Sequence, residues 1–126
     1  MKTIILMAFL GLFSSASLAQ DVDLMGTWEN EQMSIVYKFS DDSMYFQQQT
    51  FGSWFDYKMD TSQEPYSLEI TLSYAGQVQI IPALLKVVDQ DHIWIEQFPP
   101  GIEPTGFTEG ELGEKTIHKL TRRKED

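Results

Sequence analysis

The 126-residue chain contains no cysteine. It therefore has no disulfide, no thiol nucleophile and no thiolate metal ligand, and it lacks the N-terminal cysteine to which bacterial lipoproteins attach their lipid. This absence excludes the disulfide-rich secreted scaffolds and the cysteine enzymes. Stability must then come from an ordinary hydrophobic core, and a domain of this size buries roughly 65% of its unfolded surface.

Histidine is almost as rare. His92 and His118 are the only two, and no third ligand stands beside either at a spacing typical of zinc sites. Asp89 and Asp91, just before His92, are typical turn formers. The stretch "DQDHIWIE" has neither the spacing nor the glycine of a calcium loop. We therefore expect no metal site and no cofactor.

Motifs of covalent and acid–base catalysis are missing as well. No G-x-S-x-G surrounds a nucleophilic serine. The carboxylates of Asp41, Asp42, Glu109 and Glu111 all fall in predicted turns or loops, whereas a general acid needs a shielded site that raises its pKa. The sequence therefore predicts no catalytic residues, and a protein that is not an enzyme.

Positive charge is the last scarce feature. Nine Lys and Arg residues stand against 19 Asp and Glu, which gives a formal net charge of −10. Such an acidic chain is repelled by nucleic-acid phosphates and by anionic lipid surfaces, so neither is an expected partner. The charge can serve solubility alone, or it can attract a basic protein.

What is present begins with an N-terminal export segment. Lys2 is followed by the apolar run "IILMAFLGLF", and Ser17 and Ala19 occupy the −3 and −1 positions of a cleavage site. This pattern is typical of a secretory signal peptide over residues 1–19. An uncleaved anchor is the alternative, but the run is shorter than the about 20 residues of a membrane span, and no later segment is apolar enough to span. We expect one exported domain, residues 20–126, in a bacterial periplasm or secreted.

Loss of the signal peptide removes one basic and no acidic residue, which changes the formal net charge from −10 to −11. The remaining chain is long enough for a single domain, and no internal repeat or low-complexity linker divides it. We expect this domain to be a monomer.

Alternating hydrophobicity predicts strands through most of that domain. The clearest is 66–74, where Tyr66, Leu68 and Ile70 share one face and Ser67 the other. Further strands are predicted at Trp28 and at 33–40, 43–50, 53–60, 77–89, 92–98 and 114–123, with a break at Gly52, turns at 41–42, 61–65, 75–76 and 89–91, and a long loop at 99–113. Because Pro82 cannot donate to a sheet ladder, residues 82–88 form either a strand at an edge or bulge, which we prefer, or a short helix. About eight antiparallel up-and-down strands and an all-β fold follow.

The stretch "GTWEN" (26–30) places a G-x-W motif, Gly26 and Trp28, at the start of the first strand. With eight meandering strands, this motif resembles the opening of lipocalin-type barrels. The resemblance implies that the tryptophan packs across the closed end of the barrel, under an arginine from near the end of the chain. Arg122 and Arg123 are the candidates, and a guanidinium over an indole face contributes about 0.5–2 kcal/mol.

A closer resemblance is to small, uncharacterised lipocalin-like (calycin-type) domains of secreted bacterial proteins. It rests on the order of "GTWEN", "YKMDTSQEP", "YSLEITL", "ALLKVVDQDHIWIE" and "PTGF", which spans nearly the whole exported chain. The chain departs from this family at Glu103, where an arginine is usual, and in the turn at 89–91, which lacks the usual glycine. The family has no settled activity, so the resemblance implies a fold and no substrate.

Two functions from different classes suit such a domain. The first is a carrier or sensor that binds a small apolar or amphipathic ligand, because the interior of an eight-stranded barrel is wide enough for one small ligand or for side chains that fill it. The candidate pocket residues are Tyr37, Phe39, Phe55, Tyr57, Tyr66, Leu68, Ile70 and Tyr74.

The second function is a protein-interaction module that binds a basic partner, for instance as an inhibitor of a cationic hydrolase. Its candidate contact is the acidic loop "EPTGFTEGELG", with Glu103, an exposed Phe107, Glu109 and Glu111. A stable domain with neither role is the third alternative.

Overall fold

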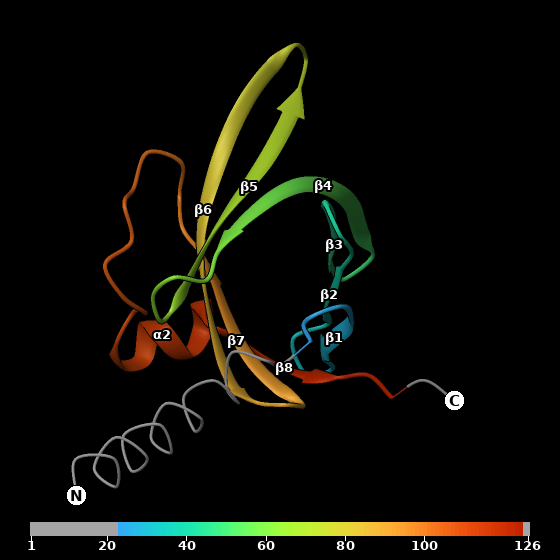
Figure 1. The fold of residues 1–126 in the computed structure, drawn as a ribbon, viewed down its shortest axis with the longest axis vertical. Helices are drawn as coiled ribbons and strands as arrows, with labels where there is room; N and C mark the ends of the chain where they lie inside the picture. The colour runs from blue at the N-terminus through green and yellow to red at the C-terminus, as the bar shows by residue number, and fades with distance from the viewer. Residues whose placement is uncertain (1–22, 125–126) are drawn as a thin grey trace, which may run out of the picture.

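The computed structural model of the protein describes residues 23–124, and the predicted signal peptide lies outside the described residues. Eight strands form a closed antiparallel barrel in which each strand pairs with the next and β8 pairs with β1 (Figure 1). The predicted all-β, up-and-down class is confirmed. In chain order the elements are β1 (Gly26–Asn30), β2 (Ile35–Phe39), β3 (Ser43–Gln48), β4 (Phe51–Asp60), β5 (Tyr66–Tyr74), β6 (Gln77–Asp89), β7 (His92–Gln97), α2 (Gly110–Thr116) and β8 (His118–Arg122).

The turns lie where turn residues predict them. Asp41 and Asp42 separate β2 from β3, and Ala75 and Gly76 separate β5 from β6. Ala75 and Gly76 have φ values of 53° and 79°, the left-handed conformation that a two-residue hairpin requires. Short turns of this kind keep consecutive strands adjacent, which produces the meander.

The predicted break at Gly52 is wrong, because this residue lies inside β4. The hydroxyl end of Tyr45, on the neighbouring strand β3, occupies the space where a Cβ on residue 52 would stand. The glycine therefore permits a close approach of an aromatic ring instead of ending the strand.

The predicted boundary between the long loop and the last strand is also wrong. The helix α2 occupies the end of the predicted loop and the start of the predicted strand, and β8 begins only at His118. A helix of two turns is too short to show a helical hydrophobic period. Its Gly113 is buried against the backbone of Thr108. The hydrophobic pattern of the sequence does not predict this contact.

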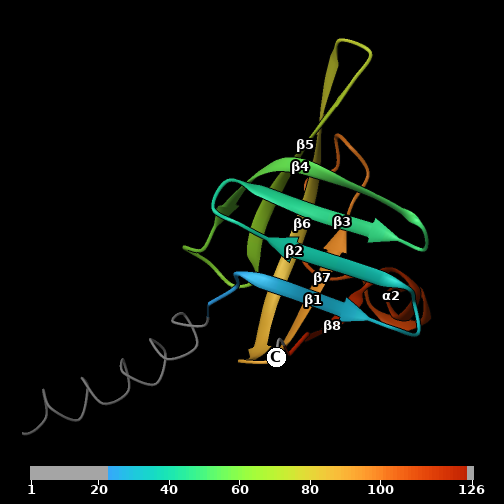
Figure 2. The same ribbon diagram turned by 90° about the vertical axis from the view of Figure 1, so that its right-hand side faces the viewer.

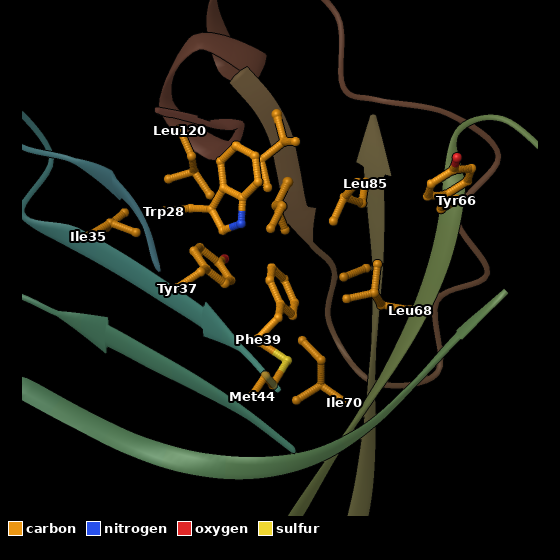
Figure 3. Packing of buried hydrophobic residues seen from close by; sticks show 13 residues of the cluster. Trp28, Ile35, Tyr37, Phe39, Met44, Tyr66, Leu68, Ile70, Leu85 and Leu120 are labelled. Atoms are coloured by element: carbon orange, nitrogen blue, oxygen red, sulfur yellow. The ribbon is translucent and has the colours of Figure 1, made fainter. Parts of the chain in front are cut away.

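The barrel core consists of inward-facing side chains that alternate along the strands (Figure 3). In this view Tyr37 lies below the indole of Trp28 and beside Phe39, and Leu120 lies to the left of the indole. Each large apolar side chain that is buried in this way contributes about 1.5–3 kcal/mol. The buried cluster comprises Trp28, Ile35, Tyr37, Phe39, Met44, Tyr66, Leu68, Ile70, Ala83, Leu85, Ile93, Ile95 and Leu120.

Trp28 and Arg122 close one end of the barrel. The Arg122 guanidinium lies 4.2 Å from the centre of the Trp28 ring, and the indole Nε1 donates to the Leu24 carbonyl at 3.0 Å. The guanidinium also donates to the carbonyls of Asp23, Met25 and Gln90.

The other candidate arginine, Arg123, is directed elsewhere. Its guanidinium pairs with the Glu29 carboxylate at 2.7 Å. Of the two arginines, Arg122 is therefore the one that covers the tryptophan. Gly26 has a φ of 111° and faces the same guanidinium, so the motif glycine also belongs to this closed end.

The strands β5 and β6 extend further than the strands β4 and β7 with which they pair on their other edges. Pairing of β4 with β5 ends at Asp56 opposite Thr71, and pairing of β6 with β7 begins at Ala83 opposite Gln97. Residues 72–82 therefore form a two-stranded ribbon that projects beyond the barrel (Figures 1 and 2). Pro82 lies where the β6–β7 ladder ends, so the preferred strand for residues 82–88 is confirmed.

Candidate functional site

The barrel is open at the end that carries the β3–β4 turn and the ribbon. Phe46, Phe55 and Ile81 face the interior, because they pair with the core residues Tyr37, Met44 and Ile70, yet all three stay half-buried. Leu72 lies on the same face and is half-buried too. We call this region the open mouth, lined by Phe46, Phe51, Ser53, Phe55, Leu72 and Ile81.

A hollow of about 400 Å³ lies along the β3–β4 side of the open mouth. It exists because the inner face of β4 carries a small side chain, Ser53, between Phe51 and Phe55. Phe46 and Gln48 from β3 complete its wall. No Lys, Arg, Asp or Glu lines it, so the hollow is apolar with amide and hydroxyl groups at its edge.

A polar cluster joins three strands inside the barrel. The Gln97 amide donates to the Tyr37 hydroxyl at 2.9 Å, and that hydroxyl lies 2.8 Å from Nδ1 of His118. Burial raises the pKa of Tyr37 well above its ordinary value, against a smaller opposite effect of the Gln97 hydrogen bond. The hydroxyl therefore stays protonated. Because the Gln97 amide already donates to this oxygen, Nδ1 of His118 is the acceptor left for the O–H, and the hydroxyl donates a hydrogen bond to it.

His118 is the member of this cluster that can still bind something. Burial lowers its pKa, and the nearby Glu96 carboxylate offsets this only in part, so the imidazole is neutral at pH 7. Because Nδ1 accepts the Tyr37 proton, the ring proton is on Nε2.

The Nε2–H of His118 is accessible. Within residues 23–124 this nitrogen has no hydrogen-bond partner, and no buried side-chain nitrogen or oxygen there is left unpaired. The imidazole stacks on Phe46 with ring centres 6.1 Å apart and planes inclined by 11°. It thus offers one hydrogen-bond donor beside the apolar open mouth.

The residues predicted to line a pocket are divided between several places. Phe55 lies in the open mouth. The half-buried Tyr57 donates its hydroxyl to the Ser40 carbonyl at 2.7 Å, near the β2–β3 turn. Tyr74 is 80% exposed near the tip of the ribbon. The other five, Tyr37, Phe39, Tyr66, Leu68 and Ile70, are buried in the core.

Sequence reasoning missed Phe46, Gln97 and His118 as parts of a site. The sequence did contain one indication for His118. It lies two residues before the apolar Leu120 on the last predicted strand, and residues two apart share a face, so His118 is expected to face inward with Leu120. The hydrogen bond between His118 and Tyr37 could not be predicted from the sequence, because 81 residues separate the two.

A second hollow, of about 310 Å³, lies near the β4–β5 turn. Its wall includes Glu64, Pro65, Tyr66, Lys86 and Phe107. Unlike the open mouth, it is bordered by a cation and an anion and lies away from the Tyr37–His118 cluster.

The acidic loop is anchored rather than free. The buried Glu96 carboxylate accepts hydrogen bonds from the Thr108 amide, the Thr108 hydroxyl and the Thr116 hydroxyl. Burial alone would raise the pKa of Glu96, but these three donors outweigh it and hold the pKa below its ordinary value.

Phe107 was expected to be exposed, and this is wrong. It is half-buried and meets the Trp94 ring edge-on, with ring centres 6.2 Å apart. The Glu103, Glu109 and Glu111 side chains of the same loop are exposed.

Metal-ligating groups do not gather in the part of the chain from 23 to 124, where no cluster of three His, Asp or Glu side chains could hold an ion. His92 bonds Asp89 through Nδ1 at 2.8 Å, away from His118. No helix in the same residues is long and apolar enough to cross a membrane.

Comparisons with protein-family models, with curated proteins and with solved structures find no match for this chain.

Proposed function

We propose that the protein is a non-catalytic, exported, lipocalin-like domain that binds a small amphipathic molecule in the open mouth. The observation that carries this proposal is a set of inward-facing apolar side chains left half-exposed, one of which, Phe46, stacks on the imidazole of His118, whose Nε2–H is unpaired. Apolar side chains inside a barrel are normally covered, so their exposure at one end marks a place for a ligand.

Each part of the site selects a part of the ligand. Phe46, Phe55 and Ile81 would contact an apolar body, with about 25 cal/mol gained per Å² of apolar surface removed from water. Nε2–H of His118 would donate to an oxygen of the ligand, such as a carbonyl, hydroxyl or carboxylate. Tyr37 and Gln97 would hold the imidazole in the orientation that this donation needs.

The lipocalin-like family and the export of the domain belong to the same proposal. The G-x-W motif and the Arg122 guanidinium over Trp28 support the family. Lys2, the apolar run and the Ser17–Ala19 cleavage pattern support export to a periplasm or to the medium.

A direct test is to purify the exported protein and to analyse an organic extract of it by mass spectrometry. We expect a stoichiometric amphipathic compound. Binding of a dansyl-labelled undecanoic acid, followed by fluorescence, provides a second measurement with a defined probe.

The probe also allows a steric test. Ser53→Trp places an indole in the hollow and should weaken probe binding by about tenfold or more, because the hollow is then filled. Leu112→Trp adds the same side chain on the exposed face of α2 and should leave binding unchanged. Equal probe affinity in both variants would contradict the proposed site.

The second candidate function is binding of a basic protein by the acidic loop. Its support is the net charge of −10 together with the exposed carboxylates of Glu103, Glu109 and Glu111, on a segment that Glu96 anchors. A pull-down at low and at high salt tests it, since capture through this charge must be lost at high salt.

A further inference from the structure

The β5–β6 ribbon has a free edge along β6. Beyond Pro82 toward the tip, residues of β6 pair only with β5, because the ladder with β7 begins at Ala83. The Pro82 carbonyl accepts the Phe98 amide at 2.8 Å, which shows that residue 82 directs its backbone groups toward the β7 side.

Backbone direction alternates along an antiparallel strand, so Ile80 and Val78 direct their N–H and C=O groups to the same side as Pro82. No strand pairs there beyond Pro82 within residues 23–124, and the loop residues 101–104 border a hollow with Ile80 without pairing with it. The ribbon thus presents four unpaired backbone groups, two donors and two acceptors, in the geometry that extends a sheet.

The same segment carries no charge. Between Glu69 and Lys86 the chain has no Asp, Glu, Lys or Arg, although its net charge is −10. Natural sheet edges are usually protected by charged side chains, and this one is not. Its side chains are apolar and open to water, with Val78 65% and Ile80 43% exposed.

We propose that two copies of this chain pair through their β6 edges, antiparallel, about a two-fold axis at Gln79. Val78 of each copy lies opposite Ile80 of the other, and each of these two pairs exchanges two backbone hydrogen bonds. The two β5–β6 ribbons then form one continuous four-stranded sheet. The proposed dimer differs from the monomer expected from the sequence.

Charge and position favour a second copy as the occupant of this edge. A strand edge that pairs antiparallel with itself is self-complementary, so one interface satisfies both copies. Two acidic molecules repel each other least where they touch through an uncharged ribbon that stands clear of both barrels (Figure 1). The ribbon itself offers a basic partner no carboxylate, since residues 70–85 contain none; the nearest, Glu69 and Glu103, lie at its base beside Ile80 and Pro82.

The pairing is short, and it buries far less than the about 800 Å² per partner of a standard stable interface. We therefore expect a reversible dimer that forms with rising protein concentration. The open mouth remains accessible in it, because the shared edge lies outside the barrel.

Sedimentation velocity of the exported protein over a range of concentrations tests the dimer. Val78→Lys should weaken dimerisation at least tenfold by placing two cations beside the shared edge. Val88→Lys adds the same charge at a 47%-exposed position of β6 outside the ribbon, and it should leave the dimer intact. A wild-type protein that stays monomeric, or a dimer that Val78→Lys does not weaken, would overturn the proposal.

The absence of cysteine allows a second, geometric test. Opposite Gln79 residues form a non-hydrogen-bonded pair with Cα atoms about 4.5 Å apart, within the range that a disulfide spans. Mild oxidation of Gln79→Cys should therefore give a covalent dimer, whereas Ser73→Cys, on the β5 edge, should not. Efficient cross-linking of Ser73→Cys alone, or assemblies larger than a dimer, would contradict pairing through β6.

Discussion

At the scale of single residues, a few side chains connect distant parts of the chain. Arg122 covers the Trp28 indole and also binds three backbone carbonyls, so one guanidinium joins β8, the segment before β1 and the β6–β7 turn. Tyr37 joins β2 to β7 and β8 through one hydroxyl. Such residues have both stability and positioning roles, which substitutions can separate.

Trp28→Ala should lower the free energy of unfolding by about 3–5 kcal/mol, because it removes a fully buried indole and leaves Arg122 over a cavity. For a domain of this size, the melting temperature falls by more than about 12 °C. Calorimetry measures the loss. Trp54→Ala, at an exposed tryptophan, is the matched control and should change the free energy by less than about 1 kcal/mol.

His118 should make stability depend on pH. Because burial lowers its folded-state pKa, the unfolded chain binds a proton more readily, and stability falls as pH decreases below the unfolded value of about 6.5. Urea unfolding between pH 7.5 and pH 5 measures this slope. His118→Gln should flatten it, and an unchanged slope in that variant would assign the effect to another group.

At the scale of elements, one buried carboxylate anchors the connection between β7 and β8. Glu96 faces outward on β7 and accepts hydrogen bonds from both ends of the segment that contains α2. A helix of seven residues is unstable alone, so its position depends on this anchor and on the buried Gly113.

Glu96→Gln should destabilise this segment by about 1–3 kcal/mol, because a neutral amide accepts weaker hydrogen bonds and brings donors that have no acceptor there. We expect faster amide hydrogen exchange in residues 98–117 while the core strands β2 and β7 stay protected. Since the pKa of Glu96 is lowered in the fold, the wild type should lose the same protection as pH falls below about 4.5 and through that lowered value. Uniform exchange across the barrel would show instead that the anchor stabilises the whole fold.

At the scale of the whole molecule, the barrel separates three regions. Trp28 and Arg122 close one end, and the apolar mouth with His118 lies at the other. The ribbon contributes Leu72 and Ile81 at its base to the mouth and projects beyond it, so its unpaired edge at Val78 and Ile80 stands apart (Figures 1 and 2). A ligand site and a pairing edge can therefore be altered independently.

If the ligand site in the open mouth and the dimer edge on β6 are independent, a substitution in one should leave the other unchanged. Val78→Lys should leave the affinity for the dansyl-labelled undecanoic acid within about twofold of wild type, because Val78 lies on the outer face of the ribbon. Ser53→Trp should conversely leave the dimer unchanged. Fluorescence titration and sedimentation velocity on the same preparations check both statements, and coupled losses would contradict independent sites.

The sequence by itself determined the strands and most turns. Alternation along 66–74 and the Ala75–Gly76 turn are local properties, and a strand needs only its own side chains to show which of them share a face. The arginine over Trp28 was instead implied by a resemblance of the G-x-W motif, and the structure identifies it as Arg122.

Only the tertiary structure decided where ladders stop, which end of the barrel stays open and which polar groups meet. These features depend on the pairing register and on unequal strand lengths. Both are set by how neighbouring strands pair, so the hydrophobic alternation within a single strand does not reveal them. Tyr37, Gln97 and His118 come together because barrel closure brings β2, β7 and β8 within hydrogen-bond distance, across 60 and 81 residues of sequence.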